Sequence, residues 1–573
     1  MNKLTKLVAV MLSAFLVGSF TMVLSGCKPD ETIRNEKVVN IRVYKGGYGS
    51  DYIYELKEKF EAAFADEGYT ANILTPSFDM HGNVALTELA QGNAETGVDL
   101  YMVGGVFVRD VEETGDYGLL VEDLTEEVWN KPAIRFDGTE EDIPIKEKVP
   151  EGILPYVTDS KGNMLGFNYM QSAAGMVVNT RKLAQYGITD LPRTTDEMFE
   201  AFDKIYLGAN GIPNSETSGT FPITYVSGTN GYTTSFLEAL FAQYEGIKGY
   251  EQYYSFTDSE GNERIDDGYE MFKSQGLLEM LKVAYRTFDV RIAAYGSTTQ
   301  GVDQAQAKIM KESGGAVFMC NGDWMYNEVK LNYSNELDDI AFMNFPVISA
   351  LGTLLFGSDT KYGLDAQASD ELLSYIIGLV DQRKSIDEII STVKAEKQIE
   401  LDRSDAERVA VARGTYYSRG IDAIAYIPKD AKGKEPAIAF LRMFASDDFA
   451  PIFTRSTNGI SAFVTDASQQ FDIEYVNQVY RVMTNPYVNI IRTQNRGLRQ
   501  RMNIGGLLPS TYHISSSINS EGISMFDGKG NYKPAPDNTP EVYYKAAELK
   551  WQKEYTYAVE QWPTWQRNAG ITG

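Results

Sequence analysis

The chain has 573 residues, a formal net charge of −26, two histidines and two cysteines. This length exceeds what one hydrophobic core supports, so it predicts two or more domains. The negative charge repels phosphate backbones, which excludes nucleic-acid binding as the function. His81 and His513 are far apart in the sequence. Neither a histidine-based zinc site nor a Ser-His-Asp triad is therefore expected, and we predict no metal, no cofactor and no catalytic residue.

The first 27 residues have the pattern of an export signal, with Lys3 and Lys6 before an apolar run that ends in Leu24-Ser25-Gly26-Cys27. This ending resembles the lipobox of bacterial lipoproteins. The resemblance implies a signal peptide over residues 1–26, removed before Cys27, and a diacylglycerol on the Cys27 thiol with acyl chains such as palmitate. The protein would then be lipid-anchored at the extracytoplasmic face of the cell membrane. The alternative is an ordinary transmembrane anchor that carries a cysteine.

Residues 27–37 are polar and include Pro29, and we predict that they form a tether between membrane and domain. With Cys27 lipidated, Cys320 has no partner, so no intramolecular disulfide is expected. No second apolar run of about eighteen residues follows. We therefore expect the mature chain not to span a membrane.

Strands and helices alternate after the tether. Strands are predicted at residues 38–44, 72–74 and 98–103, and helices from Asp51 and over 84–91. This alternation is typical of a parallel α/β sheet. In such sheets ligands bind beyond the carboxyl ends of the strands, which points to the loops at 45–50 and 104–107.

The rest of the chain continues this mixture. Asp258-Ser259-Glu260-Gly261-Asn262 is predicted to be a solvated turn, since the spacing and final glutamate of a calcium loop are missing. Strands are predicted at 165–178, 314–320, 338–347 and 420–427, and helices at 196–206, 233–243, 269–288, 305–311, 324–331, 436–445 and 542–562, with two charged helices within 368–412.

Four segments together resemble family 1 of the extracellular solute-binding proteins of ABC importers, the maltose-binding-protein-like group. They are the opening strand, glycine loop and helix (38–64), the stretch Asn179-Thr180-Arg181-Lys182 followed by Pro192-Arg193-Thr194-Thr195-Asp196-Glu197, the stretch Gly315-Ala316-Val317-Phe318-Met319-Cys320-Asn321-Gly322-Asp323-Trp324, and a strand that leads through Pro428 into a helix. The sequence departs from the family at Thr195, where a Trp is common. It departs again at Asp323, where the group's namesake has Pro.

The resemblance implies a two-lobed α/β fold, with each lobe a mainly parallel sheet flanked by helices and the lobes joined by crossing strands. The crossings would lie near 166–168, 342–346 and 459–463. The N-terminal lobe would then comprise 38–165 and 346–458, with 360–412 as an insertion. The C-terminal lobe would comprise 166–345 and 459–573.

Six residues are candidates for ligand binding. Trp324 follows a strand and a glycine turn, and the matching family residue stacks on a sugar ring, whose apolar face an indole covers well. The neighbouring carboxylate of Asp323 either accepts hydroxyl groups or caps a helix. Gly47 allows a close backbone approach. The other candidates are aromatic: Tyr48 in the same loop, Tyr169 after the first crossing, and Tyr232 in a predicted rim loop.

The leading hypothesis is a monomeric, lipid-anchored binding protein that captures a small-molecule solute, an oligosaccharide by preference, in a cleft between the lobes by hinge closure. It would deliver this solute to the transmembrane subunits of an ABC permease. A peptide-binding member of the same class is the nearest alternative. A surface-anchored glycoside hydrolase is the alternative from another class, because 79 acidic residues offer many carboxylate pairs. An adhesion or scaffolding lipoprotein is the third.

Overall fold

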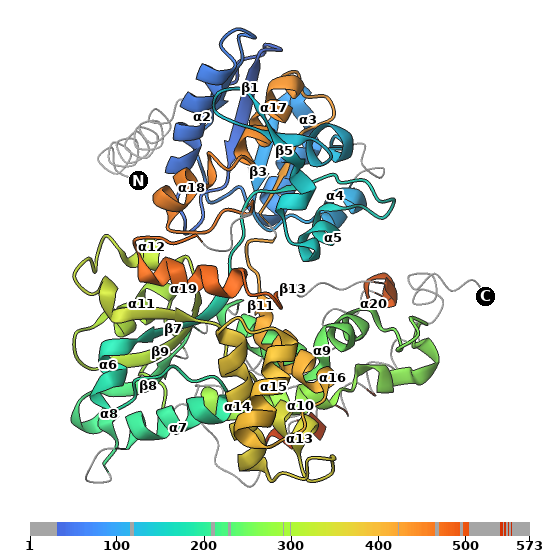
Figure 1. The fold of residues 1–573 in the computed structure, drawn as a ribbon. Coiled ribbons are helices and arrows are strands. Elements are labelled where there is room, and N and C mark those ends of the chain that lie inside the picture. Colours follow the sequence, from blue (N-terminus) through green and yellow to red (C-terminus); the bar gives the residue numbers. More distant parts are fainter. Residues whose placement is uncertain are drawn as a thin grey trace, which may run out of the picture. The chain divides into compact units, whose positions relative to one another are not determined.

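The computed structural model describes residues 31–502 apart from 115–119, 208–211, 227–230, 290, 298, 422, 464–468 and 493–496, and a few positions between 539 and 552. It contains two compact units (Figure 1). The first unit comprises the chain up to Glu147, Tyr156–Tyr169 and Ala423–Phe449, and the second comprises Lys148–Pro155, Met170–Asp422 and the chain from Ala450. The signal peptide, Cys27 and most of the helix predicted at 542–562 lie outside the described residues.

The first unit is built on a five-stranded sheet of order β2-β1-β3-β12-β6. As predicted, β1 (Val38–Val43) runs parallel to β2 (Thr70–Ile73) and to β3 (Leu100–Val103). The later strand β12 (Ile424–Tyr426) lies antiparallel to β3 and to β6 (Phe167–Asn168). The carboxyl ends of β1, β2 and β3 therefore meet at one edge of the sheet.

Helices cover this sheet, and aromatic rings hold two of them together. Phe60 of α2 contacts Phe440 of α17 with 5.3 Å between ring centroids. The elements of the unit besides the sheet are α2 (Asp51–Ala63), α3 (Gly82–Thr96), α4 (Val108–Thr114), the π-turn η1 (Thr125–Trp129), the hairpin β4 (Pro132–Ile134) and β5 (Glu140–Pro144), η2 (Ile145–Lys148), α5 (Leu154–Val157) and α17 (Lys434–Phe444) (Figure 1).

A buried carboxylate joins the sheet to two helical segments of the first unit. Asp99, which is 1% exposed, accepts hydrogen bonds at Oδ2 from the backbone N and the Nδ2 of Asn40, at 3.0 and 2.8 Å. Its Oδ1 accepts from Asn93 Nδ2 and from the backbone N of Gly433, both at 2.9 Å. The four donors belong to β1, to α3 and to the residue that precedes α17, so this one side chain fixes their relative positions.

The second unit contains a four-stranded sheet of order β10-β7-β9-β8. The central strand β7 (Ala174–Asn179) is antiparallel to β10 (Ile340–Met343) and to β9 (Gly315–Gly322), while β8 (Thr220–Thr224) is parallel to β9. All residues of β7 are buried, with Met176 and Val178 in one hydrophobic cluster and Val177 in another. The α/β class is confirmed, and strand pairing in both units is mixed rather than mainly parallel.

Helices form most of the rest of the second unit. None of the helices in the described ranges is long and apolar enough to cross a membrane. The remaining elements are η3 (Glu151–Ile153), α6 (Thr180–Gln185), α7 (Thr195–Tyr206), α8 (Asn214–Thr217), α9 (Gly231–Ser255), η4 (Ile265–Phe272), α10 (Gln275–Thr287), α11 (Val302–Met310), α12 (Met325–Val329), η5 (Leu337–Asp339), α13 (Ala350–Phe356), α14 (Ala366–Asp381), α15 (Ile386–Lys397), α16 (Arg403–Gly414), β11 (Thr415–Tyr417), α18 (Ala450–Thr457), α19 (Glu474–Met483), β13 (Asn489–Ile491) and α20 (Gly497–Met502) (Figure 1).

The stretch from Asn179 to Lys182 has a structural role. The Asn179 side chain caps α6 by accepting from the backbone N of Lys182, and its Nδ2 donates to the carbonyl of Ile309. The buried ammonium of Lys182 donates to the carbonyls of Lys308, Ile309 and Ala316. Two side chains thereby tie α6 to the end of α11, where backbone carbonyls lack helical partners, and to β9.

The stretch from Pro192 to Glu197, which follows Asn179–Lys182 in the same segment of family resemblance, contains a helix cap. Thr194 Oγ1 accepts from the backbone N of Glu197 at 3.3 Å, and Glu197 Oε2 accepts from the backbone N of Arg193. This reciprocal arrangement, with Thr194 as the cap, starts α7.

The structure corrects the predicted lobe boundaries. Residues 346–422 were predicted in the N-terminal lobe but belong to the second unit, and so do residues 450–458. The physical reason is packing: α13 and α16 lie against α9, and Leu373 and Ile376 of α14 are buried in the main hydrophobic cluster of the second unit. The chain therefore passes between the units at 422–423 and not at 342–346. It also does so at 147–148, 155–156, 169–170 and 449–450. The predicted insertion contains three helices, α14 to α16, rather than two.

Candidate functional site

Two of the predicted ligand-binding residues, Trp324 and Tyr232, lie together in the second unit. Trp324 follows β9 and precedes α12, while Tyr232 lies in the first turn of α9. Their ring centroids are 5.9 Å apart, with an angle of 56° between the planes. Trp324 is 8% exposed. This contact has no direct sign in the sequence, because the two residues are 92 positions apart in the chain.

The indole of Trp324 occupies space that is open only because Gly322 has no side chain. A Cβ atom at Gly322 would lie 2.1 Å from Cζ3 of the indole, a distance that real structures do not show. Tyr475 donates a hydrogen bond to the Gly322 carbonyl at 3.0 Å, which holds the backbone under the ring. The glycine before the tryptophan is thus required for the position of the ring.

Arg419 is a member of this cluster that the sequence analysis missed. Its guanidinium carbon lies 5.7 Å from the centre of the Tyr232 ring and 6.0 Å from that of Trp324, within the range of cation–π attraction. Within the described ranges it makes no hydrogen bond and no ion pair. The one feature of the sequence that could have indicated Arg419 is its position before Gly420, in the loop between two buried strands. The aromatic cluster, defined as Trp324, Tyr232 and Arg419, thus combines two rings with a positive charge.

Asp323, the residue before Trp324, is buried rather than exposed to solvent. Its side chain is almost fully buried, and its backbone N donates to the carbonyl of Ala173 at 3.1 Å. Burial, and then the negative charge of Asp323, raise the pKa of the Tyr416 and Tyr475 hydroxyls. The residue at the N-cap of α12 is Trp324, whose side chain makes no cap bond.

In the first unit, the glycine loop follows β1 as predicted. Gly49 has a φ of 77°, and its backbone N donates to the carbonyl of Gly46 at 3.0 Å, so residues 46–49 form a tight turn around Gly47. Tyr48 is only 6% exposed, so little of its ring is open to solvent. A ring in this position supports the loop more than it offers a surface to solvent.

Other aromatic side chains lie at the same edge of the first unit. Tyr44, half-buried directly after β1, and the exposed His81 before α3 have ring centroids 5.5 Å apart. His81 lies on Gly104 and Gly105, where a Cβ on Gly105 would be 2.4 Å from its ring. Phe78 in the neighbouring loop is 65% exposed. These loops follow β1, β2 and β3, so the edge that the sequence indicated for ligand binding carries exposed rings, although not those that were chosen.

Tyr169 was predicted to face a ligand cleft, and the structure corrects this. Its side chain is fully buried in the first unit, where its hydroxyl donates to the carbonyl of Val103 at 3.1 Å and its ring contacts Phe444. A tyrosine in a core needs one hydrogen-bond acceptor for its hydroxyl, and the end of β3 provides it.

The sequence matches no model of a known protein family and no curated protein. The structure, in contrast, is similar to solved structures of binding proteins over almost its full length. A probable secreted solute-binding lipoprotein from Streptomyces coelicolor is 12% identical, with a TM-score of 0.55 and coverage of 91% of this chain and 100% of that one. RafE in complex with raffinose is 11% identical, with a TM-score of 0.53 and coverage of 90% and 99%. A family 1 extracellular solute-binding protein from Bifidobacterium longum subsp. infantis is 14% identical, with a TM-score of 0.50 and coverage of 91% and 100%.

At these identities the likeness establishes the fold alone. The fold is that of the two-lobed solute-binding proteins, and the similar structures are binding proteins rather than enzymes. One of them is described as a family 1 extracellular solute-binding protein, the group that the sequence motifs resemble.

Proposed function

We propose that this protein is an extracytoplasmic solute-binding protein that captures a carbohydrate, and that the aromatic cluster of the second unit is part of its binding site. The observation that carries the proposal is the pairing of Trp324 with Tyr232 at the end of β9. Two rings held at an angle cover the apolar faces of sugar rings, and a cation beside them donates hydrogen bonds to hydroxyl groups.

The wider proposal combines this site with the fold and the N-terminal sequence. Solved structures with this fold include a protein in complex with raffinose and a chitin oligosaccharide binding protein, which supports an oligosaccharide as the ligand. The export signal ending in Cys27 supports lipid anchoring at the membrane. We propose hinge closure upon the ligand and delivery to an ABC permease as the mechanism, with Gly47, Tyr48 and Asp323 as supporting residues.

Ligand-dependent stabilisation tests this proposal. Raffinose, maltose and chitin oligosaccharides are added to the mature chain, and its thermal midpoint is measured. A ligand at 100 times its dissociation constant adds about 2.7 kcal/mol to the stability of the native state. Trp324→Ala should weaken binding of the active sugar by about tenfold or more, ~1.4 kcal/mol. Tyr295→Ala is the control, because it removes a ring that is 74% exposed in the same unit.

The outcomes separate the alternatives. Sugar that binds and is recovered intact supports the proposal. Stabilisation by peptides alone would keep the class and change the ligand. Consumption of the sugar would identify a hydrolase. Equal weakening by Trp324→Ala and Tyr295→Ala would refute the assigned site.

A further inference from the structure

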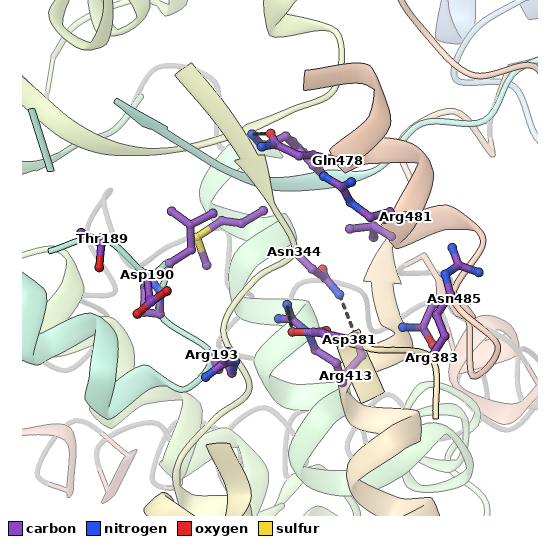
Figure 2. A pocket seen from close by; sticks show the side chains of 15 residues that line it. Thr189, Asp190, Arg193, Asn344, Asp381, Arg383, Arg413, Gln478, Arg481 and Asn485 are labelled. Atoms are coloured by element: carbon purple, nitrogen blue, oxygen red, sulfur yellow. Dashed lines mark hydrogen bonds and ion pairs between the residues drawn. The ribbon is translucent and has the colours of Figure 1, made fainter. Parts of the chain in front are cut away.

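The second unit contains an arginine-lined pocket of about 360 Å³ that is built from elements other than those of the aromatic cluster. Four segments contribute the guanidinium groups: Arg193 precedes α7, Arg383 follows α14, Arg413 lies in the last turn of α16, and Arg481 lies in α19 (Figure 2). The volume is at the small end of the range of ligand pockets. A chain with a net charge of −26 repels anions on average, so a cationic cavity in it is a local exception.

Arg413 is held rigidly with one donor left over. Its Nε and Nη2 donate to the two carboxylate oxygens of Asp381 at 2.7 and 3.1 Å, which fixes the plane of the guanidinium. The third nitrogen, Nη1, is buried and has no hydrogen-bond partner among the described residues. A buried donor of a charged group without a partner is costly, and a bound acceptor would remove this cost.

Two more guanidinium groups at the pocket lack an acidic partner. Arg383 donates to the backbone carbonyl and hydroxyl of Thr484 at 2.9 and 2.7 Å, and both acceptors are neutral. The side chain of Arg193 makes no hydrogen bond and no ion pair within the described ranges. It lies along α14, with its Cζ 3.5 Å from the place of a Cβ on Gly378. Its position is thus defined by contact with a helix while its charge stays uncompensated.

The opposing charges at the pocket are fewer. Asp381 is committed to Arg413, Asp190 is exposed at the edge, and Arg481 pairs with Glu474. Asn344 carries no charge, and its Oδ1 already accepts from the backbone N of Phe345. Its Nδ2 donates to the carbonyls of Arg413 and Thr415. The lining therefore offers donors and positive charge in excess of acceptors.

We propose that this pocket binds a small oxyanion, a phosphate- or carboxylate-bearing metabolite, at a second site that is separate from the carbohydrate site. Guanidinium groups form paired, charge-assisted hydrogen bonds with both kinds of oxyanion. The inference does not depend on the proposed sugar binding, since it rests on Arg193, Arg383 and Arg413 alone.

Calorimetric titration of the mature chain with inorganic phosphate and with citrate, at constant ionic strength, tests the proposal and distinguishes the two sources of the anion. Arg193→Gln and Arg383→Gln should each weaken binding of the active probe by about tenfold, the loss of one hydrogen bond to a charged group. The matched control is Arg403→Gln at the other end of α16, an exposed arginine that lies outside the pocket.

Further variants keep the test informative if one substitution prevents folding. Arg193→Lys keeps the charge but loses the planar donor pair, so it should recover only part of the affinity even if Arg193→Gln is poorly folded. Trp324→Ala should leave anion binding unchanged. Binding of neither probe at 10 mM would overturn the proposal. Equal weakening by Arg403→Gln would also overturn it, because the effect of the positive charge would then not be specific to the pocket.

Discussion

The carboxylate of Asp99 provides the strictest test of how the first unit is held together. Each of its oxygens accepts two hydrogen bonds from buried donors, in Asn40 on one side and in Asn93 and Gly433 on the other. Asp99→Asn keeps the shape of the side chain but turns one oxygen into an NH2 group. Whichever way the amide is oriented, its N–H groups then face two donors.

The magnitude follows from this geometry. Two hydrogen bonds to a charged group are lost, and each is worth about 1.5–3 kcal/mol. The substitution should therefore lower the free energy of unfolding of the first unit by roughly 3–6 kcal/mol. Asp142→Asn is the control, since Asp142 is exposed on β5, and it should change stability by less than about 0.5 kcal/mol.

The assay has to report on the first unit by itself, because a chain with two units need not unfold in one step. Hydrogen exchange of peptides from β1, α3 and α17, measured as a function of denaturant, satisfies this condition. A loss below about 1 kcal/mol for Asp99→Asn would show that the four hydrogen bonds contribute little beyond what water offers the same groups.

Three further outcomes are expected. Burial raises the pKa of Glu328 from its ordinary value of 4.5 to about 6, so the folded state holds the proton more tightly and stability falls as pH rises from about 4.5 to about 6. Glu328→Gln should remove this slope and add up to about 2 kcal/mol at pH 7, and an unchanged slope in urea titrations would contradict it. Gly322→Ala should displace the Trp324 indole and weaken sugar binding in calorimetry, whereas Gly301→Ala, with open space around its Cβ, should not. Burial raises the pKa of the Cys320 thiol, so in the mature chain it should react with Ellman's reagent only after unfolding, and fast reaction in the native state would show that the strand opens.

The local patterns of the sequence predicted the elements well because their causes are local. The alternation of apolar residues in β1 and the apolar face of α2 depend on nearest neighbours in the chain. The assignment of helices to units failed for a different reason. The apolar face of α14 does not by itself say which core it packs against. Only long-range contacts, of α13 and α16 with α9 and of α14 with α13 and α16, place these helices in the second unit.

The same distinction applies to the candidate site. The tryptophan at the end of β9 was predictable from the motif that precedes it, but its neighbours Tyr232 and Arg419 come from distant segments. Tyr169 shows the opposite error. A tyrosine has an apolar body and a polar tip, so its sequence context does not separate a core position with one acceptor from a ligand-binding position.

One short segment connects the two candidate sites of the second unit. Arg413 lies in the last turn of α16 at the pocket, β11 (Thr415–Tyr417) follows, and Arg419 then lies beside the rings of Tyr232 and Trp324 in the aromatic cluster. All three residues of β11 are buried, and the strand pairs in parallel with β13. Because a buried, paired strand has a single conformation, it fixes both arginines before any ligand arrives, and such preorganisation lowers the cost of binding at each site. Occupation of one site therefore requires no rearrangement of the strand that supports the other.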